Sequence, residues 1–167
     1  MPEYPIFHRR NLHKQVQNSS KEKYQNGDYY GALEEACKVY AQEVRRTAIL
    51  KSPDCKNKIE PLDDRVLMDK VFSEDTTKAI LSIAANIRRP DGVLMDTKTR
   101  SSLEAAQRSL SVGIITGYRN PLAHEQHNDL SATGVISEQH CLDALSLVSL
   151  LMLRLTDANK AESVSVD

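Results

Sequence analysis

Residues Asp28–Leu50 read DYYGALEEACKVYAQEVRRTAIL, a run in which apolar side chains recur at steps of three and four. These apolar positions are Tyr29, Leu33, Ala36, Cys37, Tyr40, Val44 and Ala48. The spacing places them on one face of an α-helix, which turns once in about 3.6 residues. Asp28 is a good helix N-cap, and Lys51-Ser52-Pro53 ends the helix. We therefore predict one long amphipathic helix here.

Helical periodicity continues along most of the chain, whereas the alternating pattern of a strand is scarce. We predict further helices over residues 11–25, 62–72, 73–87, 101–118 and 137–155. Pro90-Asp91-Gly92 is a turn signal between two helical halves. The core face expected for the helix over 101–118 is Leu103, Ala106, Leu110, Ile114 and Tyr118. The apolar residues of the last helix cover nearly every face, so we expect it to be central or shared with a partner chain.

A second stripe on the 101–118 helix consists of small residues four apart, namely Ala105, Ser109, Gly113 and Gly117. Two glycines inside a helix cost about 1 kcal/mol each relative to alanine, so they are expected to have a packing role. Such a stripe lets another helix approach closely. Core packing and a helix-mediated contact between subunits are both open interpretations.

The chain of 167 residues suits one domain with a small appendage. We expect an N-terminal helical arm over residues 1–26, a helical domain over 27–155 and a flexible C-terminal tail over 156–167. Lys and Arg total 22 and Asp and Glu total 23, for a net charge of −1. This balance argues against an electrostatically driven DNA binder, but it leaves room for a small basic site on an RNA enzyme.

The three cysteines, Cys37, Cys55 and Cys141, form no CxxC pair, so neither a zinc ribbon nor a disulfide scaffold is indicated. The first ten residues lack the apolar core of a signal peptide. The apolar run over residues 141–155 is too short to span a membrane. We therefore expect a cytoplasmic protein that has no membrane partner and needs no cofactor.

The densest cluster of functional side chains is Arg119-Asn120-Pro121-Leu122-Ala123-His124. Proline interrupts a helix interior but suits the first position of a new helix, with Asn120 as its N-cap. The sequence therefore predicts a helix break at Asn120, after Arg119 and one turn before His124. A break of this kind can bring a guanidinium and an imidazole toward one point.

These residue types match phosphodiester chemistry on RNA, whose 2′-hydroxyl is a built-in nucleophile. His124 can transfer protons near pH 7, Arg119 can hold phosphate oxygens, and Asn120 can orient either one. One histidine leaves one proton-transfer role unfilled, and a twofold dimer would supply a second copy of His124. Spacing alone is also compatible with a simple helix kink, a solvated arginine and a hydrogen-bonded histidine.

Other polar residues have two interpretations each. Glu125 could tune His124 or be a first-turn helix carboxylate, and His127 could be a second proton carrier or a surface residue. The two pairs Arg45-Arg46 and Arg88-Arg89 could contact an RNA backbone or lie on solvated faces. The spacing of His124 and His127 is one residue short of HExxH, and no further ligands are evident, so no metal site is predicted.

The motif GYRNPLAHE over residues 117–125 resembles the Arg-x4–6-His motif of the HEPN superfamily. Three further blocks resemble the Ymh-type branch of that superfamily. They are GDYYGALEEA over residues 27–36, LMDKVFS over 67–73 and ALSLVSLL over 144–151. The resemblance therefore spans residues 27–155.

This resemblance implies an all-α, HEPN-like bundle of four to five helices with an N-terminal helical extension, and a homodimer with facing motifs. It also implies metal-independent RNA cleavage to a 2′,3′-cyclic phosphate by Arg119, Asn120 and His124, in a toxin–antitoxin or antiviral defence system. A cognate antitoxin or defence partner is expected. Many such toxins have a tyrosine two residues after the histidine, where this chain has Gln126. The alternative is a non-catalytic subunit that binds nucleotide or RNA, or acts as an adaptor.

Overall fold

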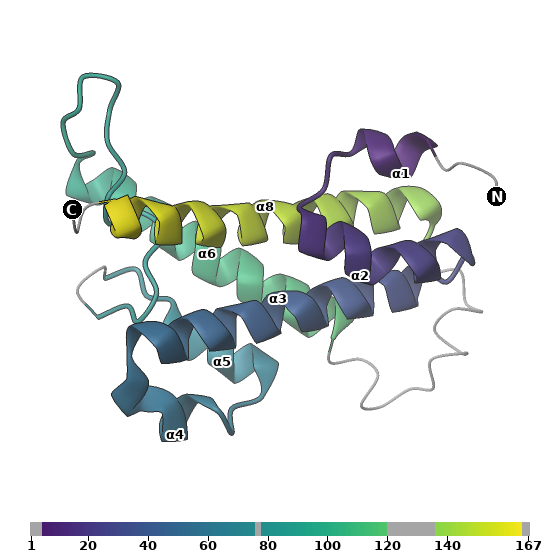
Figure 1. Cartoon of the computed structure of the whole chain (residues 1–167), viewed down its shortest axis with the longest axis horizontal. Coiled ribbons are helices and arrows are strands. Elements are labelled where there is room, and N and C mark those ends of the chain that lie inside the picture. Colours follow the sequence, from purple (N-terminus) through teal and green to yellow (C-terminus); the bar gives the residue numbers. More distant parts are fainter. Residues whose placement is uncertain (1–4, 76–77, 120–135, 165–167) are drawn as a thin grey trace. The chain divides into compact units, whose positions relative to one another are not determined.

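The computed structural model describes residues 5–75, 78–119 and 136–164 (Figure 1). Its α-helices are α1 (Pro5–Arg9), α2 (Lys14–Gln25), α3 (Tyr29–Lys51), α4 (Lys56–Ile59), α5 (Asp64–Val71), α6 (Thr97–Tyr118) and α8 (Glu138–Val164). A short 3-10 helix, η1, spans Pro53–Cys55. Within these ranges no strand is present, and the single β-bridge joins Arg88 and Leu94. The predicted all-α fold class is confirmed.

The chain divides into two compact units. The first comprises residues 1–40 and 114–152, and the second comprises residues 41–113 and 153–167. None of the helices in the described ranges is long and apolar enough to cross a membrane.

In the first unit, α1 and α2 belong to the core. Phe7 packs on Tyr24 with ring centroids 4.7 Å apart, and both side chains are buried. The Tyr24 hydroxyl donates to Glu138 at 2.5 Å, and the amide of His13 donates to the Ser149 hydroxyl at 2.6 Å. The residues predicted as an arm therefore share a core with the start of α8.

The predicted start of α3 is confirmed by its cap. The Asp28 carboxylate accepts a hydrogen bond from the amide of Gly31 at 2.9 Å and pairs with Lys23 at 3.3 Å. A Cβ on Gly31 would lie 2.1 Å from that carboxylate, so only glycine admits this close approach. Gly27, with φ +75°, supplies the turn from α2 into the cap.

In the second unit, the helix predicted over residues 73–87 is wrong. The described residues of this segment form turns and bends, in which Leu81, Ile83 and Ala84 are buried. The amide of Ala84 donates to the carboxylate of Glu104 at 2.8 Å. The segment therefore satisfies part of its backbone with a side chain from α6 rather than with helical carbonyls.

The predicted core face of α6 is also wrong by one position over its first half. Glu104, Gln107 and Ser111 are fully buried, whereas Leu110 is 37% exposed. Leu103 and Ala106 are half-buried. The helix is therefore turned so that its polar residues face the core, where Glu104 accepts hydrogen bonds from the 82–84 segment.

Most of the small-residue stripe of α6 is exposed to solvent. Ser109, Gly113 and Gly117 are exposed, and a Cβ placed on either glycine would meet nothing within 4 Å among the residues described. Core packing, the first interpretation of this stripe, is not observed within the described part of the chain. The second interpretation, a contact between subunits, stays a prediction.

The last helix begins as predicted and ends later. Ser137 caps α8, because its hydroxyl accepts a hydrogen bond from the amide of His140 at 3.2 Å. The helix then continues past the predicted end at Leu155 to Val164. Residues 156–164 contain neither Gly nor Pro, so nothing local stops the helix, and these residues of the predicted flexible tail are helical.

Candidate functional site

Arg119 is the one residue of the predicted catalytic set that the structure describes. Asn120 and His124, and the auxiliary residues Glu125 and His127, lie outside the described residues. Helix α6 ends at Tyr118, and the amide of Arg119 still donates to the carbonyl of Ile115 at 2.9 Å. Helix α6 therefore ends at the predicted residue, Tyr118, and the predicted break at Asn120 lies outside the described residues.

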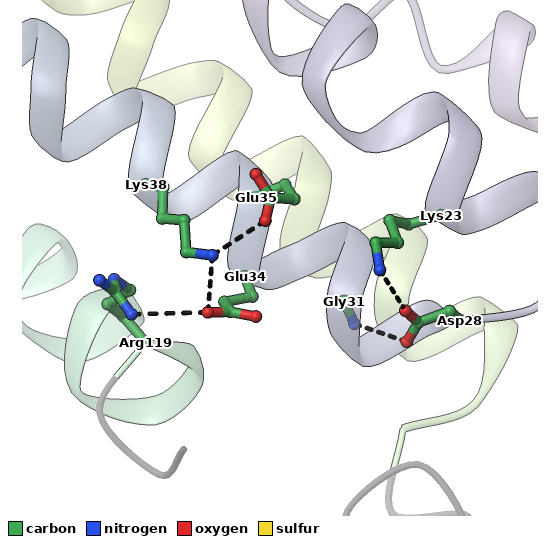
Figure 2. A network of polar contacts seen from close by, with 7 residues as sticks. All are labelled: Lys23, Asp28, Gly31, Glu34, Glu35, Lys38 and Arg119. Carbon is green, nitrogen blue, oxygen red and sulfur yellow. Dashed lines mark hydrogen bonds and ion pairs between the residues drawn. The ribbon is translucent and has the colours of Figure 1, made fainter. Parts of the chain in front are cut away.

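The guanidinium of Arg119 contacts α3 through an ion pair. Its Nη1 lies 3.5 Å from Oε1 of Glu34, and the two side chains are 34% and 13% exposed (Figure 2). This distance is longer than the range of about 2.7–2.9 Å for a tight charge-assisted hydrogen bond. Glu34 therefore orients Arg119 loosely while solvent, or a ligand, can reach the guanidinium.

Glu34 is shared between two cations. Nζ of Lys38 lies 2.9 Å from carboxylate oxygens of both Glu34 and Glu35 (Figure 2). The hydrogen bonds to Glu34 and Glu35 raise the pKa of Lys38, which keeps it charged. The network of Arg119, Lys38, Glu34 and Glu35 thus balances two positive charges with two negative ones.

Tyr30 lies one helical turn before Glu34 on α3 and takes part in the same electrostatic environment. Burial raises the pKa of its hydroxyl, the carboxylate of Glu34 raises it further, and the positive charge of Arg119 opposes them. Tyr30, Glu34 and Lys38 follow one another at four-residue steps, so they share one face of α3. This face is next to Arg119.

A second histidine lies beside the motif. The Tyr118 hydroxyl and Nε2 of His140 are 2.5 Å apart, and the two rings meet edge to face with centroids 5.8 Å apart. Burial, followed by the neighbouring thiols of Cys37 and Cys141, raises the pKa of Tyr118. His140 is exposed, so its imidazole is accessible to solvent next to Tyr118, the residue that precedes Arg119.

Sequence reasoning did not select Glu34 or His140 as site residues. The only local signal for Glu34 was its four-residue spacing from Lys38, which is typical of an ordinary surface pair. Glu34 and Arg119 are 85 positions apart, and nothing in their local sequences links them.

The four arginines considered as RNA contacts lie in the second unit, whereas Arg119 lies in the first. Arg45 donates to the carbonyls of Ile59, Glu60 and Leu62 and to the carboxylate of Asp64, at distances between 2.8 and 3.1 Å.

The other three arginines of that group are exposed. Arg46 pairs with Glu43 on its own helix, and Arg88 donates to the carbonyl of Gly92. The amide of Arg89 donates to the carbonyl of Val93. None of these contacts joins the four arginines into a single basic patch.

The described ranges contain no group of three or more His, Cys, Asp or Glu side chains that could hold a metal ion. Burial raises the pKa of Cys141 to about 12, so this thiol stays protonated at neutral pH and is a poor nucleophile.

No curated protein and no solved structure matches this chain. A family model with the description "Protein of unknown function (Hypoth_ymh)" matches residues 10–155. The matched range includes α2 to α6, the Arg119–His124 motif and most of α8. The chain therefore belongs to the Hypoth_ymh family.

Proposed function

We propose that this protein is a metal-independent endoribonuclease of the HEPN type, acting in a toxin–antitoxin or antiviral defence system. The observation that carries the proposal is the placement of Arg119. Its partly exposed guanidinium lies at the end of α6 and is oriented by Glu34. In the chain, Arg119 directly precedes Asn120 and comes five residues before His124.

The chemistry requires two proton transfers and a cation. The 2′-hydroxyl of the RNA attacks the adjacent phosphorus while a base removes its proton. An acid protonates the departing 5′-oxygen, and the product is a 2′,3′-cyclic phosphate. In this proposal His124 transfers protons, Arg119 stabilises the charge on the phosphorane, and Asn120 positions the phosphate.

A homodimer would complete the site, since two copies of His124 can fill the roles of base and acid. The open stripe of α6 supports this part of the proposal. Gly113 and Gly117 leave room for a close approach by a second helix, and the partly exposed Leu110 adds apolar area beside them.

The second candidate is a non-catalytic HEPN subunit that binds RNA or nucleotide, or acts as an adaptor. The balanced charges around Arg119 favour it, because a guanidinium held by Glu34 can also serve to join α6 to α3. Under this alternative Arg119 contributes to the fold and to ligand binding, and no phosphodiester is broken.

An RNA cleavage assay in the presence of EDTA tests the first proposal. End-labelled RNA is incubated with the wild type, His124→Ala, Arg119→Ala and the control Arg65→Ala, whose side chain is exposed on α5. We expect cyclic-phosphate ends from the wild type and the control only. Cleavage that persists in both motif variants contradicts the proposal. RNA binding without cleavage, lost in Arg119→Ala, supports the adaptor.

A further inference from the structure

The second unit contains a cavity of about 340 Å³, and Arg119, the described residue of the proposed RNA site, does not line it. Its apolar walls come from the 82–87 segment, from α6 and from the end of α8, and include Ile83, Ile87, Leu103 and Ala158. Arg154 and Asp157 also line it. This size is at the lower end of the range of about 300–1,000 Å³ for pockets that bind small molecules.

One wall of the cavity is held by side chains from α6. Glu104, which is fully buried, accepts hydrogen bonds from the hydroxyl of Ser82 and from the amide of Ala84. Arg100 donates to the carbonyl of Ala85 at 3.5 Å. These contacts fix the 82–87 segment in its non-helical path, so the cavity is part of the folded unit rather than a gap beside a loose loop.

Several buried polar side-chain atoms at this cavity and behind its wall have no hydrogen-bond partner among the described residues. Nη1 of Arg154, Nε of Arg100 and Oε2 of Glu104 are buried, and no partner for them is present in the described part of the chain. Buried polar atoms are almost always hydrogen-bonded in folded proteins, and an unpaired one costs free energy. A ligand that pairs with Arg154 would recover this cost.

We infer that this cavity binds a small amphipathic monocarboxylate. The apolar walls contact the body of the ligand, and the guanidinium of Arg154 donates hydrogen bonds to its carboxylate. Asp157 lines the same cavity and Glu104 lies behind its wall, so a second negative charge on the ligand would be repelled. This electrostatic balance favours a single carboxylate over a doubly charged phosphate.

Isothermal titration calorimetry on the full chain at pH 8 tests the inference, with octanoate, octanol and octyl phosphate as probes. We expect saturable binding of octanoate, and binding at least tenfold weaker for the neutral alcohol and for the dianionic phosphate. The variant Arg154→Met keeps most of the side-chain volume and should lose at least tenfold in affinity for octanoate. The control Arg65→Met should bind as the wild type does.

A second variant covers the case in which Arg154→Met does not fold. Leu103 lines the cavity and is only half-buried, so Leu103→Trp can fill the space from its open side. With helical circular dichroism and melting temperature retained, this variant should no longer bind octanoate. Absence of octanoate binding to the wild type at millimolar concentration, or undiminished binding to either folded variant, overturns the inference. RNA cleavage does not enter this test.

Discussion

The guanidinium of Arg119 lies 3.5 Å from the carboxylate of Glu34, a residue 85 positions earlier in the chain. This ion pair joins the end of α6 to α3 within the first unit. In the proposed ribonuclease, Glu34 is a positioning residue that holds Arg119 ready for the phosphate.

The first prediction concerns this pair. Glu34→Gln removes the negative charge but keeps the shape of the side chain, so Arg119 loses this ion pair and is held less firmly. We expect cleavage of RNA to fall about tenfold, mainly in kcat. The free energy of unfolding should change by less than about 1 kcal/mol, because the pair is partly exposed.

The matched control is Lys38→Met, which removes the other cation on Glu34 while leaving Arg119 paired. This variant should cleave within about threefold of the wild type. An equal loss of cleavage in both variants would mean that the intact network on α3, rather than the pair of Glu34 with Arg119, supports activity.

The second prediction separates a composite dimeric site from a site within one chain. His140 is held by the hydroxyl of Tyr118, and in a composite site a second His124 makes it dispensable for proton transfer. His140→Gln should therefore retain cleavage within about threefold. Its loss of stability should be about 1 kcal/mol, the typical value of one hydrogen bond.

Rates and denaturation midpoints of His140→Gln and Tyr118→Phe check this prediction together. Tyr118→Phe breaks the same hydrogen bond and leaves the imidazole in place. Abolished cleavage in His140→Gln, with normal cleavage in Tyr118→Phe, would identify His140 as a proton-transfer group and remove the need for a second chain.

The third prediction concerns Arg45, whose guanidinium donates to three carbonyls and one carboxylate from the end of α4 to the start of α5. Arg45→Met should lower the free energy of unfolding by about 2–3 kcal/mol, since hydrogen bonds from charged groups are the stronger ones. Arg46→Met removes a neighbouring exposed pair and should cost less than about 1 kcal/mol. Urea denaturation of both variants measures the difference, and equal costs would contradict it.

The parts of the fold that sequence could predict are those with local causes. The caps Asp28 and Ser137 act within three residues of themselves, and both were identifiable from the residues that follow them. The end of α6 before Asn120-Pro121 likewise follows from the chemistry of proline.

The parts that sequence could not predict depend on long-range polar contacts. The apolar spacing of α6 indicates a core face through Leu103 and Leu110, but Glu104 turns the helix by binding the 82–84 segment. The pairing of Arg119 with Glu34 has the same character. The residues that flank Arg119 and Glu34 in the sequence do not indicate which distant group each of them contacts.

The fourth prediction tests the orientation of α6 directly. By hydrophobicity Leu103→Ala should cost more than Glu104→Ala, whereas the structure indicates the reverse. Glu104→Ala leaves the amide of Ala84 and the hydroxyl of Ser82 without their acceptor, and should cost about 2–4 kcal/mol. Leu103→Ala, at a half-buried position, should cost about 1 kcal/mol. Chemical denaturation of the two variants ranks them, and the opposite order would contradict the observed register.

The last prediction is the dependence of stability on alkaline pH. Burial raises the pKa of the Cys141 thiol from its ordinary value of 9.0 to about 12 in the folded chain. The folded state therefore keeps this proton after the unfolded state has lost it. Stability from this group is complete below pH 9 and declines as the pH rises toward 12, by about 1.4 kcal/mol per pH unit.

Urea denaturation of the wild type and Cys141→Ala at several pH values between 8 and 10 measures this slope as the difference between the two proteins, because tyrosines ionise in the unfolded chains of both near pH 10. Cys141→Ala should be less stable than the wild type at pH 8, because it leaves a small space in the core. Its stability should nevertheless fall less steeply above pH 9. Parallel curves for the two proteins would mean that Cys141 titrates alike in the folded and unfolded states, contrary to its burial.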